Sequence, residues 1–195
     1  MTTFVLATAN PHKAQEMASL LHGLDVHLIA RPKEVPDVAE TEDTLEGNAL
    51  LKAHARVEAT GYAAIADDTG LFVDALGGRP GVHSARYAGE SASYHDNVVK
   101  LLGELEGVET ARRGARFRTV VVVAYPQGAP LIVEGSLEGF ITTEPVGDEG
   151  FGYDPVFAPS SEGGRTLAQL SLDEKNAISH RGNALRALAL ALGAR

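Results

Sequence analysis

Short apolar runs alternate with segments of helical periodicity in the first part of the chain. Thr3–Ala7 and Val26–Ala30 are predicted to be buried strands, because each run is short, largely apolar and bounded by polar or proline-containing segments. Between them, Asn10 and Pro11 are residue types favoured at the cap and the first position of a helix. This helix is predicted to face the core through apolar residues at helical spacing, namely Met17, Leu20, Leu21 and Leu24.

The next segment changes from extended to helical. Arg31–Pro36 contains several proline-linked positions and predicts an extended loop. A longer helix is predicted from about Asp43, with Glu46 as its capping-box partner, to about Thr60. Gly61 is expected to end this helix, because glycine readily adopts the left-handed conformation that follows a helix.

The middle of the chain predicts a strand, a glycine-rich segment and another helix. The strand covers Tyr62–Ala66 and is expected to place Asp67 and Asp68 at its C-terminal end. Gly77–Gly89 is rich in glycine and predicts a long loop or lid. A helix is expected over Tyr94–Leu105.

The second half begins with two β-type runs. Arg116–Tyr125 and Pro130–Phe140 predict a β-hairpin around Gln127-Gly128. After a further glycine-rich loop, Ser179 is expected to cap a terminal helix. The βαβ order followed by a hairpin predicts an α/β protein with a mixed sheet, and we expect one domain over residues 1–195. The terminal helix is expected to pack through Leu185, Leu188 and Leu192.

Composition narrows the class of protein. The 195 residues are 44% hydrophobic and 22% charged, which is typical of a globular protein, and the net charge of -9 disfavours nucleic acid or an anionic membrane as a partner. The sequence has no cysteine, which excludes disulfides, thiolate metal sites and cysteine nucleophiles. Neither a signal peptide nor a membrane-spanning run is found, so we expect a soluble, cytoplasmic protein.

The first candidate for chemistry is the strand-to-helix turn Thr8-Ala9-Asn10-Pro11-His12-Lys13. Backbone amides at the start of a helix favour anions, and phosphate is a common occupant. The charge of Lys13 opposes the helix dipole unless an anion lies nearby. A solvated surface lysine is the alternative interpretation.

The second candidate is Asp67-Asp68-Thr69-Gly70. Two adjacent carboxylates are costly to hold close together without a cation, and Mg²⁺ bound by carboxylates, water and substrate phosphates is a usual solution. A turn in which aspartate and glycine only satisfy backbone geometry is the alternative. Glu40 and Glu42 are candidates for a further carboxylate ligand.

Two more groups are candidates for contacts with a ligand. Asn48 and Lys52 are four residues apart and share one helix face, which points either to solvent or into a cleft. Phe151 and Tyr153 flank a glycine and offer a flat surface on which a base can stack. An aromatic core strand followed by a capped helix is the alternative for this C-terminal region. Its polar candidates are Asp154, Lys175, His180 and Arg181, whose side chains include donors to ring oxygens.

Taken together, these segments resemble the inosine triphosphate pyrophosphatase family, whose members are also described as XTP/dITP diphosphatases. The similarity runs in order over nearly the whole chain. So many matching blocks in one order are very specific, whereas a lone Asp-Asp-Thr-Gly is not. The matching blocks are Leu6–Lys13, Leu45–Ala49, Ala66–Leu71, Val73–Val82, Ser84–Tyr87, Gly150–Phe157 and Ser179–Gly182.

The resemblance implies an elongated two-lobed α/β fold around a central mixed β-sheet, an active-site cleft between the lobes, and a homodimer. It implies hydrolysis of non-standard purine nucleoside triphosphates (ITP, dITP, XTP) to the monophosphate and pyrophosphate, with Mg²⁺ as cofactor. Asp68 is expected to be the catalytic base and, with Glu40, a metal ligand. The expected substrate-binding residues are Thr8, Ala9, Asn10, Pro11, His12, Lys13, Thr69, Phe151, Gly152, Tyr153, Asp154, Lys175, His180 and Arg181.

Small departures and two rival functions accompany this resemblance. His12 stands where many relatives carry glycine, and Thr69 where serine is frequent, although the hydroxyl is retained. One rival is a related pyrophosphatase for modified pyrimidine nucleotides. The other is a nucleotide-binding sensor without turnover, which release of pyrophosphate under Mg²⁺ would exclude.

Overall fold

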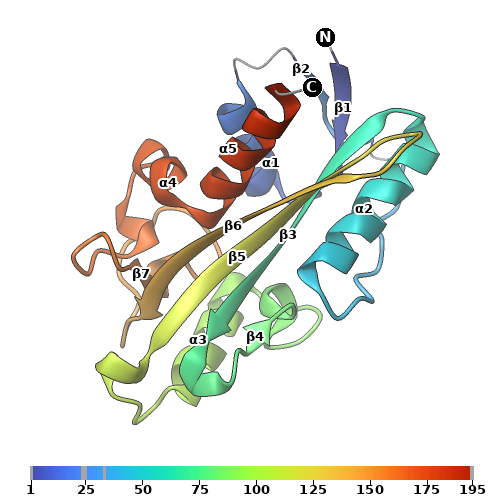
Figure 1. The fold of residues 1–195 in the computed structure, drawn as a ribbon. Helices are drawn as coiled ribbons and strands as arrows, with labels where there is room; N and C mark the ends of the chain where they lie inside the picture. The colour runs from blue at the N-terminus through green and yellow to red at the C-terminus, as the bar shows by residue number, and fades with distance from the viewer. Residues whose placement is uncertain (1, 23–25, 33, 194–195) are drawn as a thin grey trace. The chain divides into compact units, whose positions relative to one another are not determined.

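The computed structural model describes residues 2–22, 26–32 and 34–193, so the predicted core residue Leu24 lies outside the described residues. Helices and strands alternate over residues 2–73, as Figure 1 shows. The helices are α1 (Pro11–Leu21), α2 (Leu45–Thr60), α3 (Tyr94–Glu104), α4 (Leu172–Ile178) and α5 (His180–Gly193). The strands are β1 (Thr2–Leu6), β2 (Val26–Ile29), β3 (Ala63–Val73), β4 (Pro80–Gly81), β5 (Gly114–Ala124), β6 (Leu131–Ile141) and β7 (Phe157–Pro159).

The described strands form one mixed sheet. Their order is β2-β1-β3-β5-β6-β7, and β4 pairs with β3. β1 is parallel to β2 and to β3, with Val5 opposite Ile29 on one side and Ala64 on the other. β4 is antiparallel to β3, and β7 is antiparallel to β6. The predicted α/β class with a mixed sheet is confirmed.

The predicted hairpin is also present. β5 and β6 are neighbours in the sheet and are joined by residues 125–130. A connection of this length is too short for a parallel crossover, so the two strands run antiparallel. Gly128 in this connection has φ +93°, a left-handed conformation that glycine adopts without steric cost.

Contacts divide the chain into two compact units, each built from separated stretches of sequence. The expected cleft between lobes and the single-domain organisation stay predictions. Unit 1 comprises Met1–Asp68, Thr119–Gly135 and Arg181–Arg195, and unit 2 comprises Thr69–Arg118 and Ser136–His180.

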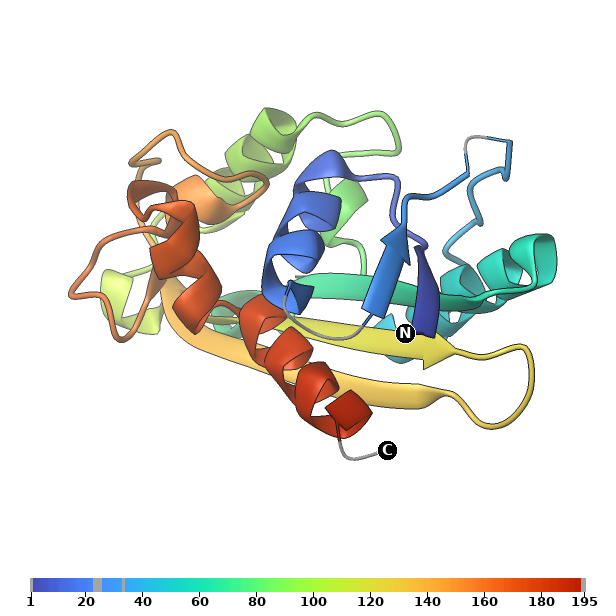
Figure 2. The ribbon, with the colours of Figure 1, turned by 90° about the horizontal axis from the view of Figure 1, so that it is seen from above.

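Unit 1 has helices on both faces of its strands. Phe4 of β1 and Ile65 of β3 belong to one buried cluster with Met17 of α1 and Leu185 of α5. Figures 1 and 2 show α1 and α5 near each other on this face, and Figure 1 shows α2 on the other. Since side chains alternate along a strand, Asp67 lies on the same face of β3 as Ala63 and Ile65, toward α1 and α5.

Unit 2 has a separate buried core. Leu71 and Val73 of β3 pack in one cluster with Leu101 of α3 and Phe157 of β7. Tyr153 belongs to the same cluster. This core covers the second half of β3, so the strand is buried along most of its length.

The boundaries of two predicted elements are wrong. β3 continues to Val73 instead of ending at Ala66, because its later residues also pair, with Leu71 opposite Gly81 of β4. α2 begins at Leu45, and its cap is Thr44 instead of Asp43. The Thr44 hydroxyl accepts a hydrogen bond from the Gly47 amide at 3.0 Å. Both Asp67 and Asp68 therefore lie inside a strand.

The loops contain more regular structure than the sequence predicts. The expected loop Gly77–Gly89 contains β4 and a short 3-10 helix over Ser84–Arg86. Helix α4 was not predicted, whereas α5 begins directly after Ser179 as expected. Among the described residues, no helix has the length and apolarity needed to cross a bilayer. The prediction that α5 packs through Leu185, Leu188 and Leu192 is confirmed, because all three lie in or against the core of unit 1. The other 3-10 helices are Asp74–Leu76, Thr110–Arg112, Asp154–Val156 and Leu167–Gln169.

Candidate functional site

The turn before α1 is organised by its own side chains. Asn10 caps the helix as predicted, because its Oδ1 accepts hydrogen bonds from the amides of His12 (3.0 Å) and Lys13 (3.5 Å). The Thr8 hydroxyl accepts a hydrogen bond from the Asn10 amide at 3.1 Å. The amides of His12 and Lys13 are thus used by the cap, although amides at the start of a helix favour anions. Of the remaining residues, Ala9 and Pro11 are exposed.

The Lys13 side chain lies against a carboxylate. Its Nζ is 3.0 Å from Oδ2 of Asp67. The negative charge of Asp67 offsets the unfavourable interaction between Lys13 and the positive end of the helix dipole, so the anion near Lys13 is a side chain of the protein itself. The Arg181 guanidinium also contacts Asp67, with Nε and Nη2 each 3.2 Å from Oδ2, and its Nη1 donates to Glu16. Lys13, Glu16, Asp67 and Arg181 form a cluster that we call the Asp67 network.

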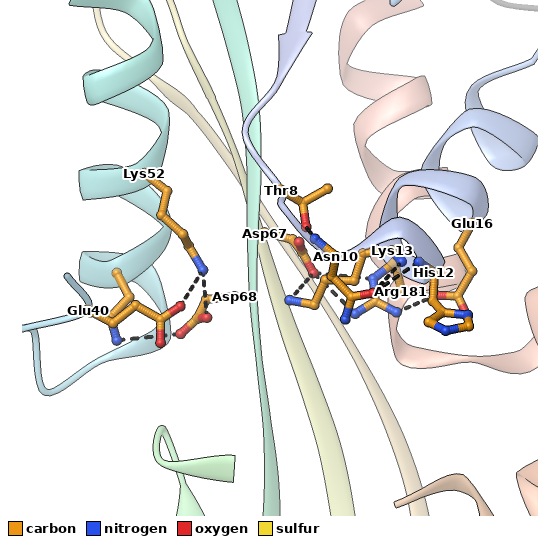
Figure 3. Close-up of polar contacts among 11 residues, drawn as sticks. Thr8, Asn10, His12, Lys13, Glu16, Glu40, Lys52, Asp67, Asp68 and Arg181 are labelled. Atoms are coloured by element: carbon orange, nitrogen blue, oxygen red, sulfur yellow. Dashed lines mark hydrogen bonds and ion pairs between the residues drawn. The ribbon is translucent and has the colours of Figure 1, made fainter. Parts of the chain in front are cut away.

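Asp67 and Asp68 do not share a site. Consecutive side chains of a strand point to opposite faces, and Figure 3 shows Asp67 toward α1 and α5 while Asp68 points toward α2. The expectation that the two carboxylates are held near each other by one cation is therefore wrong. Each carboxylate has its own cationic partners, and both are buried.

Asp68 belongs to a second cluster, which consists of Glu40, Asn48, Lys52 and Asp68 and which we call the Asp68 cluster. Lys52 Nζ lies 2.8 Å from Asp68 Oδ1 and 3.0 Å from Glu40 Oε1 (Figure 3). Asn48 Nδ2 lies 3.5 Å from Asp68 Oδ2. The face shared by Asn48 and Lys52 thus points to Asp68 and not to open solvent. Glu42 is exposed, so Glu40 is the better of the two candidate ligands.

Burial and neighbouring charges shift the pKa values of these groups. Burial raises the pKa of Asp68 above its ordinary value, although Lys52 and Lys13 oppose this shift. Burial also acts to raise the pKa of Asp67, but the charges of Lys13, Arg181 and Lys52 outweigh it and hold that pKa well below its usual range. Burial lowers the pKa of Lys13. Asp68 is therefore the carboxylate better suited to accept a proton.

The Asp68 cluster fits a hard divalent cation. Glu40 and Asp68 each place an oxygen within 3.0 Å of the same nitrogen, so the two carboxylates converge on one positive charge. No group of three or more Asp, Glu or His side chains is placed to hold a metal within the part of the chain that the structure describes. Mg²⁺ needs only one or two protein carboxylates when substrate phosphates and water supply the other ligands.

An aromatic cluster in unit 2 brings together three of the predicted binding residues. Asp154 Oδ2 accepts hydrogen bonds from the Phe151 amide (2.9 Å) and from Lys175 Nζ (2.7 Å). Lys175 Nζ also lies 4.7 Å from the centre of the Phe151 ring, and the Tyr94 ring lies 5.9 Å from that centre. Asp154 and Lys175 are buried and Phe151 is half-buried. Phe151, Asp154 and Lys175 therefore lie together, and their contact with a nucleoside stays a prediction.

The second predicted aromatic does not join this cluster as a stacking surface. Tyr153 is buried in the core of unit 2, and its hydroxyl donates to the Ser84 carbonyl at 2.9 Å. The ring of His180 is also buried and stacks on Phe117 at 4.5 Å. The stacking role expected for Tyr153 is wrong, because its ring is used in packing. The half-buried Thr69 and Gly152 lie beside Asp68 and Phe151 in sequence, and contact of either residue with substrate stays a prediction.

A family model matches this chain over residues 4–191, and it describes the Ham1 family. The chain belongs to the Ham1 family. Curated relatives cover the same span, so the resemblance drawn from the sequence blocks is confirmed.

Curated relatives of this Ham1-family chain include dITP/XTP pyrophosphatases. The dITP/XTP pyrophosphatase of Bacillus subtilis is 45% identical, with 100% of this chain and 98% of the relative covered. The dITP/XTP pyrophosphatase of Nitratidesulfovibrio vulgaris is 51% identical, with 95% and 93% covered. Among solved structures, a HAM1 protein from Coxiella burnetii has a TM-score of 0.91 at 43% identity and covers 100% of both chains.

Sequence reasoning missed two residues of these clusters. Glu16 is buried and binds Arg181, and its place three residues after Lys13 on α1 was a usable signal. Tyr94 lies at the first position of α3 and contacts Phe151. Arg181 was expected to contact a base, but the structure places its guanidinium in the Asp67 network. Direct contact of Arg181 with substrate stays a prediction.

Proposed function

We propose that this Ham1-family chain hydrolyses non-standard purine nucleoside triphosphates, namely ITP, dITP and XTP, to the monophosphate and pyrophosphate. The names of its full-length relatives support this proposal. The observation in the structure that carries it is the Asp68 cluster, in which two carboxylates converge on one cation. Such a cluster suits phosphoryl chemistry, where most of the catalysis is positioning and charge compensation.

Asp68 is the general base in this proposal. Pyrophosphate leaves, so water attacks the α-phosphorus, and a carboxylate must orient that water or take its proton. Burial raises the pKa of Asp68, which brings it closer to the range useful for a base at neutral pH. Lys52 holds the Asp68 carboxylate in place and adds positive charge where the phosphates bind.

Glu40 and Asp68 are the proposed ligands of Mg²⁺. When bound, the ion supplies positive charge that screens the phosphate oxygens and stabilises the leaving pyrophosphate. Lys52 contacts both carboxylates, so its ammonium would add positive charge beside the ion that they would hold. Lys13 is proposed to contribute its charge to the triphosphate, with Asp67 holding its side chain in position.

Phe151 and Lys175 are proposed to bind the base. The Lys175 ammonium lies over the Phe151 ring, so a base stacked near that ring meets a hydrogen-bond donor. An oxygen at purine position 6 accepts from this donor, whereas the amino group of adenine does not. This arrangement supports a base with an oxo group, and the names of the relatives support a purine over the rival modified pyrimidines.

Two wider features of the protein stay proposals. The family resemblance supports a homodimer, and the absence of cysteine fits a cytoplasmic location. Sedimentation of the purified protein over a range of concentrations measures its oligomeric state.

The deciding experiment identifies the products of hydrolysis. The protein is incubated with Mg²⁺ and either ITP, XTP or a modified pyrimidine triphosphate, and the products are separated by ion-exchange chromatography. We expect inosine or xanthosine monophosphate and pyrophosphate in equal amounts. Orthophosphate as the first product contradicts the proposed bond cleavage, and binding without any product supports the rival sensor.

A further inference from the structure

Helix α2 holds the segment Pro36–Glu42 through contacts one helical turn apart. Asn48 binds the Glu42 backbone twice, since its Oδ1 accepts from the Glu42 amide at 3.0 Å and its Nδ2 donates to the Glu42 carbonyl at 3.2 Å. Lys52 contacts the Glu40 side chain at 3.0 Å. Arg56 Nη1 donates to the Pro36 carbonyl at 2.9 Å. Asn48, Lys52 and Arg56 follow one another at four-residue spacing, so they share one face of the helix.

The spacing of the contacts matches the geometry of the two segments. Four helical residues advance about 6 Å. Two residues of extended chain advance about 6.6 Å, so the step from Glu42 to Glu40 matches the step from Asn48 to Lys52. Pro36 lies farther along the segment, and the long Arg56 side chain reaches its carbonyl. The segment therefore runs antiparallel to the helix and is held at both ends.

The buried Arg56 side chain contacts the segment at both Pro36 and Asp37. It is 1% exposed, and its Nη2 lies 3.9 Å from Asp37 Oδ1. Arg31 also holds this end of the segment, because its Nη1 lies 2.5 Å from Asp37 Oδ1 and its Nη2 donates to the Val35 carbonyl at 2.9 Å. A buried guanidinium with a backbone carbonyl as acceptor fixes the chain at that carbonyl.

The position of the Glu40 carboxylate depends on these contacts between α2 and its segment. The segment Pro36–Glu42 belongs to no helix or strand, so the regular hydrogen bonds of secondary structure do not hold it. A ligand carried on such a segment binds an ion less tightly when the segment samples other conformations, since the apparent dissociation constant rises as the competent fraction falls. A clamp at each end keeps the Glu40 carboxylate near Asp68.

We propose that Arg56 is a positioning residue for Glu40, acting through the backbone of Pro36–Glu42 and touching neither substrate nor metal. The proposal rests on the proposed function, in which Glu40 holds Mg²⁺. Asn48 clamps the other end, but it also contacts Asp68, so Arg56 gives the cleaner test.

The test measures metal affinity directly. Mn²⁺, a paramagnetic substitute for Mg²⁺, is titrated into the full-length protein, and free Mn²⁺ is followed by electron paramagnetic resonance. Arg56→Met keeps the apolar stem and removes the donors, and we expect it to weaken Mn²⁺ binding about tenfold. Arg56→Lys retains one charged donor and should give an intermediate affinity. Glu40→Gln is the positive control and should weaken binding at least as much.

Arg113 offers a matched control in unit 2. It is also buried, and it donates to the backbone carbonyls of Val108 (3.0 Å), Thr142 (2.9 Å) and Leu105 (2.8 Å). Arg113→Met should lower the melting temperature but leave Mn²⁺ affinity unchanged. Equal weakening by Arg113→Met and Arg56→Met would show that lost stability, and not lost positioning, moves the affinity, and would overturn the proposal.

The remaining outcomes also decide the matter. Wild-type affinity in Arg56→Met, with weak binding in Glu40→Gln, overturns the role of Arg56. If Arg56→Met does not fold, the affinity of Arg56→Lys decides in its place. Absence of Mn²⁺ binding by the wild type overturns the inference as well. Failure of the proposed function shows separately, as the absence of pyrophosphate release from ITP by the wild-type protein.

Discussion

At the scale of single residues, Asp67 and Asp68 show how one step along a strand separates two roles. Asp67 contacts Lys13 and Arg181, whose charges hold its pKa well below the usual range. Asp68 lies with Lys52, and burial raises its pKa. Because adjacent strand residues face opposite sides, two carboxylates with identical chemistry occupy different electrostatic surroundings. Asp67 is suited to hold the cationic side chains in place, and Asp68 is suited to take part in proton transfer.

Asp68→Asn should abolish most of the turnover while the protein stays folded. The change removes a metal ligand and the proposed base but keeps the shape of the side chain. We expect kcat for pyrophosphate release from ITP to fall by at least about a hundredfold. Circular dichroism and a thermal melt check that the fold is intact. A folded variant with near-normal kcat would remove Asp68 from the mechanism.

Asp67→Asn should act on stability first. It leaves the half-buried Lys13 and the buried Arg181 without this carboxylate, which costs about 3 kcal/mol in the free energy of unfolding. The exposed Asp148 is the control, and Asp148→Asn should change that free energy by less than about 0.5 kcal/mol. Urea titrations at neutral pH measure both values. Equal, small effects of the two substitutions would contradict the structural role of Asp67.

The same carboxylate predicts a pH dependence. Its folded pKa lies below the unfolded value of 3.8, so the unfolded chain binds the proton first as the pH falls. The contribution of Asp67 is present above pH 3.8 and is lost progressively as the pH drops through the folded pKa. Urea titrations between neutral pH and pH 3 should therefore show a smaller acid-induced loss of stability in Asp67→Asn than in the wild type. A loss of the same size in both proteins would be evidence against this linkage.

At the scale of elements, the turn that carries Phe151 depends on a glycine. Gly150 has φ +77°, and a Cβ on it would collide with Asp154 Oδ2. That oxygen accepts hydrogen bonds from both the Phe151 amide and Lys175. A side chain at position 150 therefore has to displace the Asp154 carboxylate, which binds both the Phe151 backbone amide and the Lys175 ammonium.

Gly150→Ala should weaken binding of the base more than it slows the chemical step. Displacement of Asp154 moves both Phe151 and Lys175, so we expect KM for ITP to rise about tenfold with a smaller change in kcat. Gly103 in α3 is the control, since it has open space around it and a helical conformation. Gly103→Ala should leave KM unchanged and stabilise the protein by up to about 1 kcal/mol. Steady-state kinetics on both variants decide the matter, and an unchanged KM in Gly150→Ala would contradict the assignment of this turn to base binding.

The elements also show where prediction from sequence succeeds. The Asn10 cap and Pro11 start of α1 were predictable because the cap acts within four residues. The continuation of β3 through Asp67 and Asp68 was not, because those carboxylates are tolerated in a buried strand only through distant partners such as Lys52 and Arg181. Helix α4 had a usable local signal in the Ser171–Glu174 capping box, which the prediction overlooked.

At the scale of the whole molecule, net charge is a poor guide to the ligand. The chain carries a net charge of -9, which alone would discourage a triphosphate. The fold nevertheless gathers Lys13, Lys52 and Arg181 from distant parts of the sequence around Asp67 and Asp68. The family blocks recognisable in the sequence contain Lys13, the two aspartates and Arg181 but not Lys52, and the pairing of cations with carboxylates was visible only in three dimensions.

Selectivity among purines is the property on which the proposed function depends. Lys175 lies over the Phe151 ring and donates to Asp154, so a base bound there meets an ammonium group. The 6-oxygen of inosine and xanthosine accepts from this donor, whereas the 6-amino group of adenine presents another donor. Sites that leave a buried donor unpaired discriminate by about 10⁴-fold, so we expect kcat/KM for ATP to be lower than for ITP by roughly that factor. GTP shares the 6-oxygen, and the margin against it should be smaller.

The measurement compares kcat/KM for ITP, XTP, GTP and ATP with Mg²⁺ present, following pyrophosphate and monophosphate together. Lys175→Met is the informative variant, because it removes the donor and keeps much of the apolar stem beside Phe151. It should lower kcat/KM for ITP far more than for ATP, so that the preference between the two narrows. If the wild type hydrolysed ATP as well as ITP, the base-reading role of Lys175 and the proposed function would both be wrong. If instead the preference survived in Lys175→Met, the function would stand and the donor that reads the 6-oxygen would have to be another group.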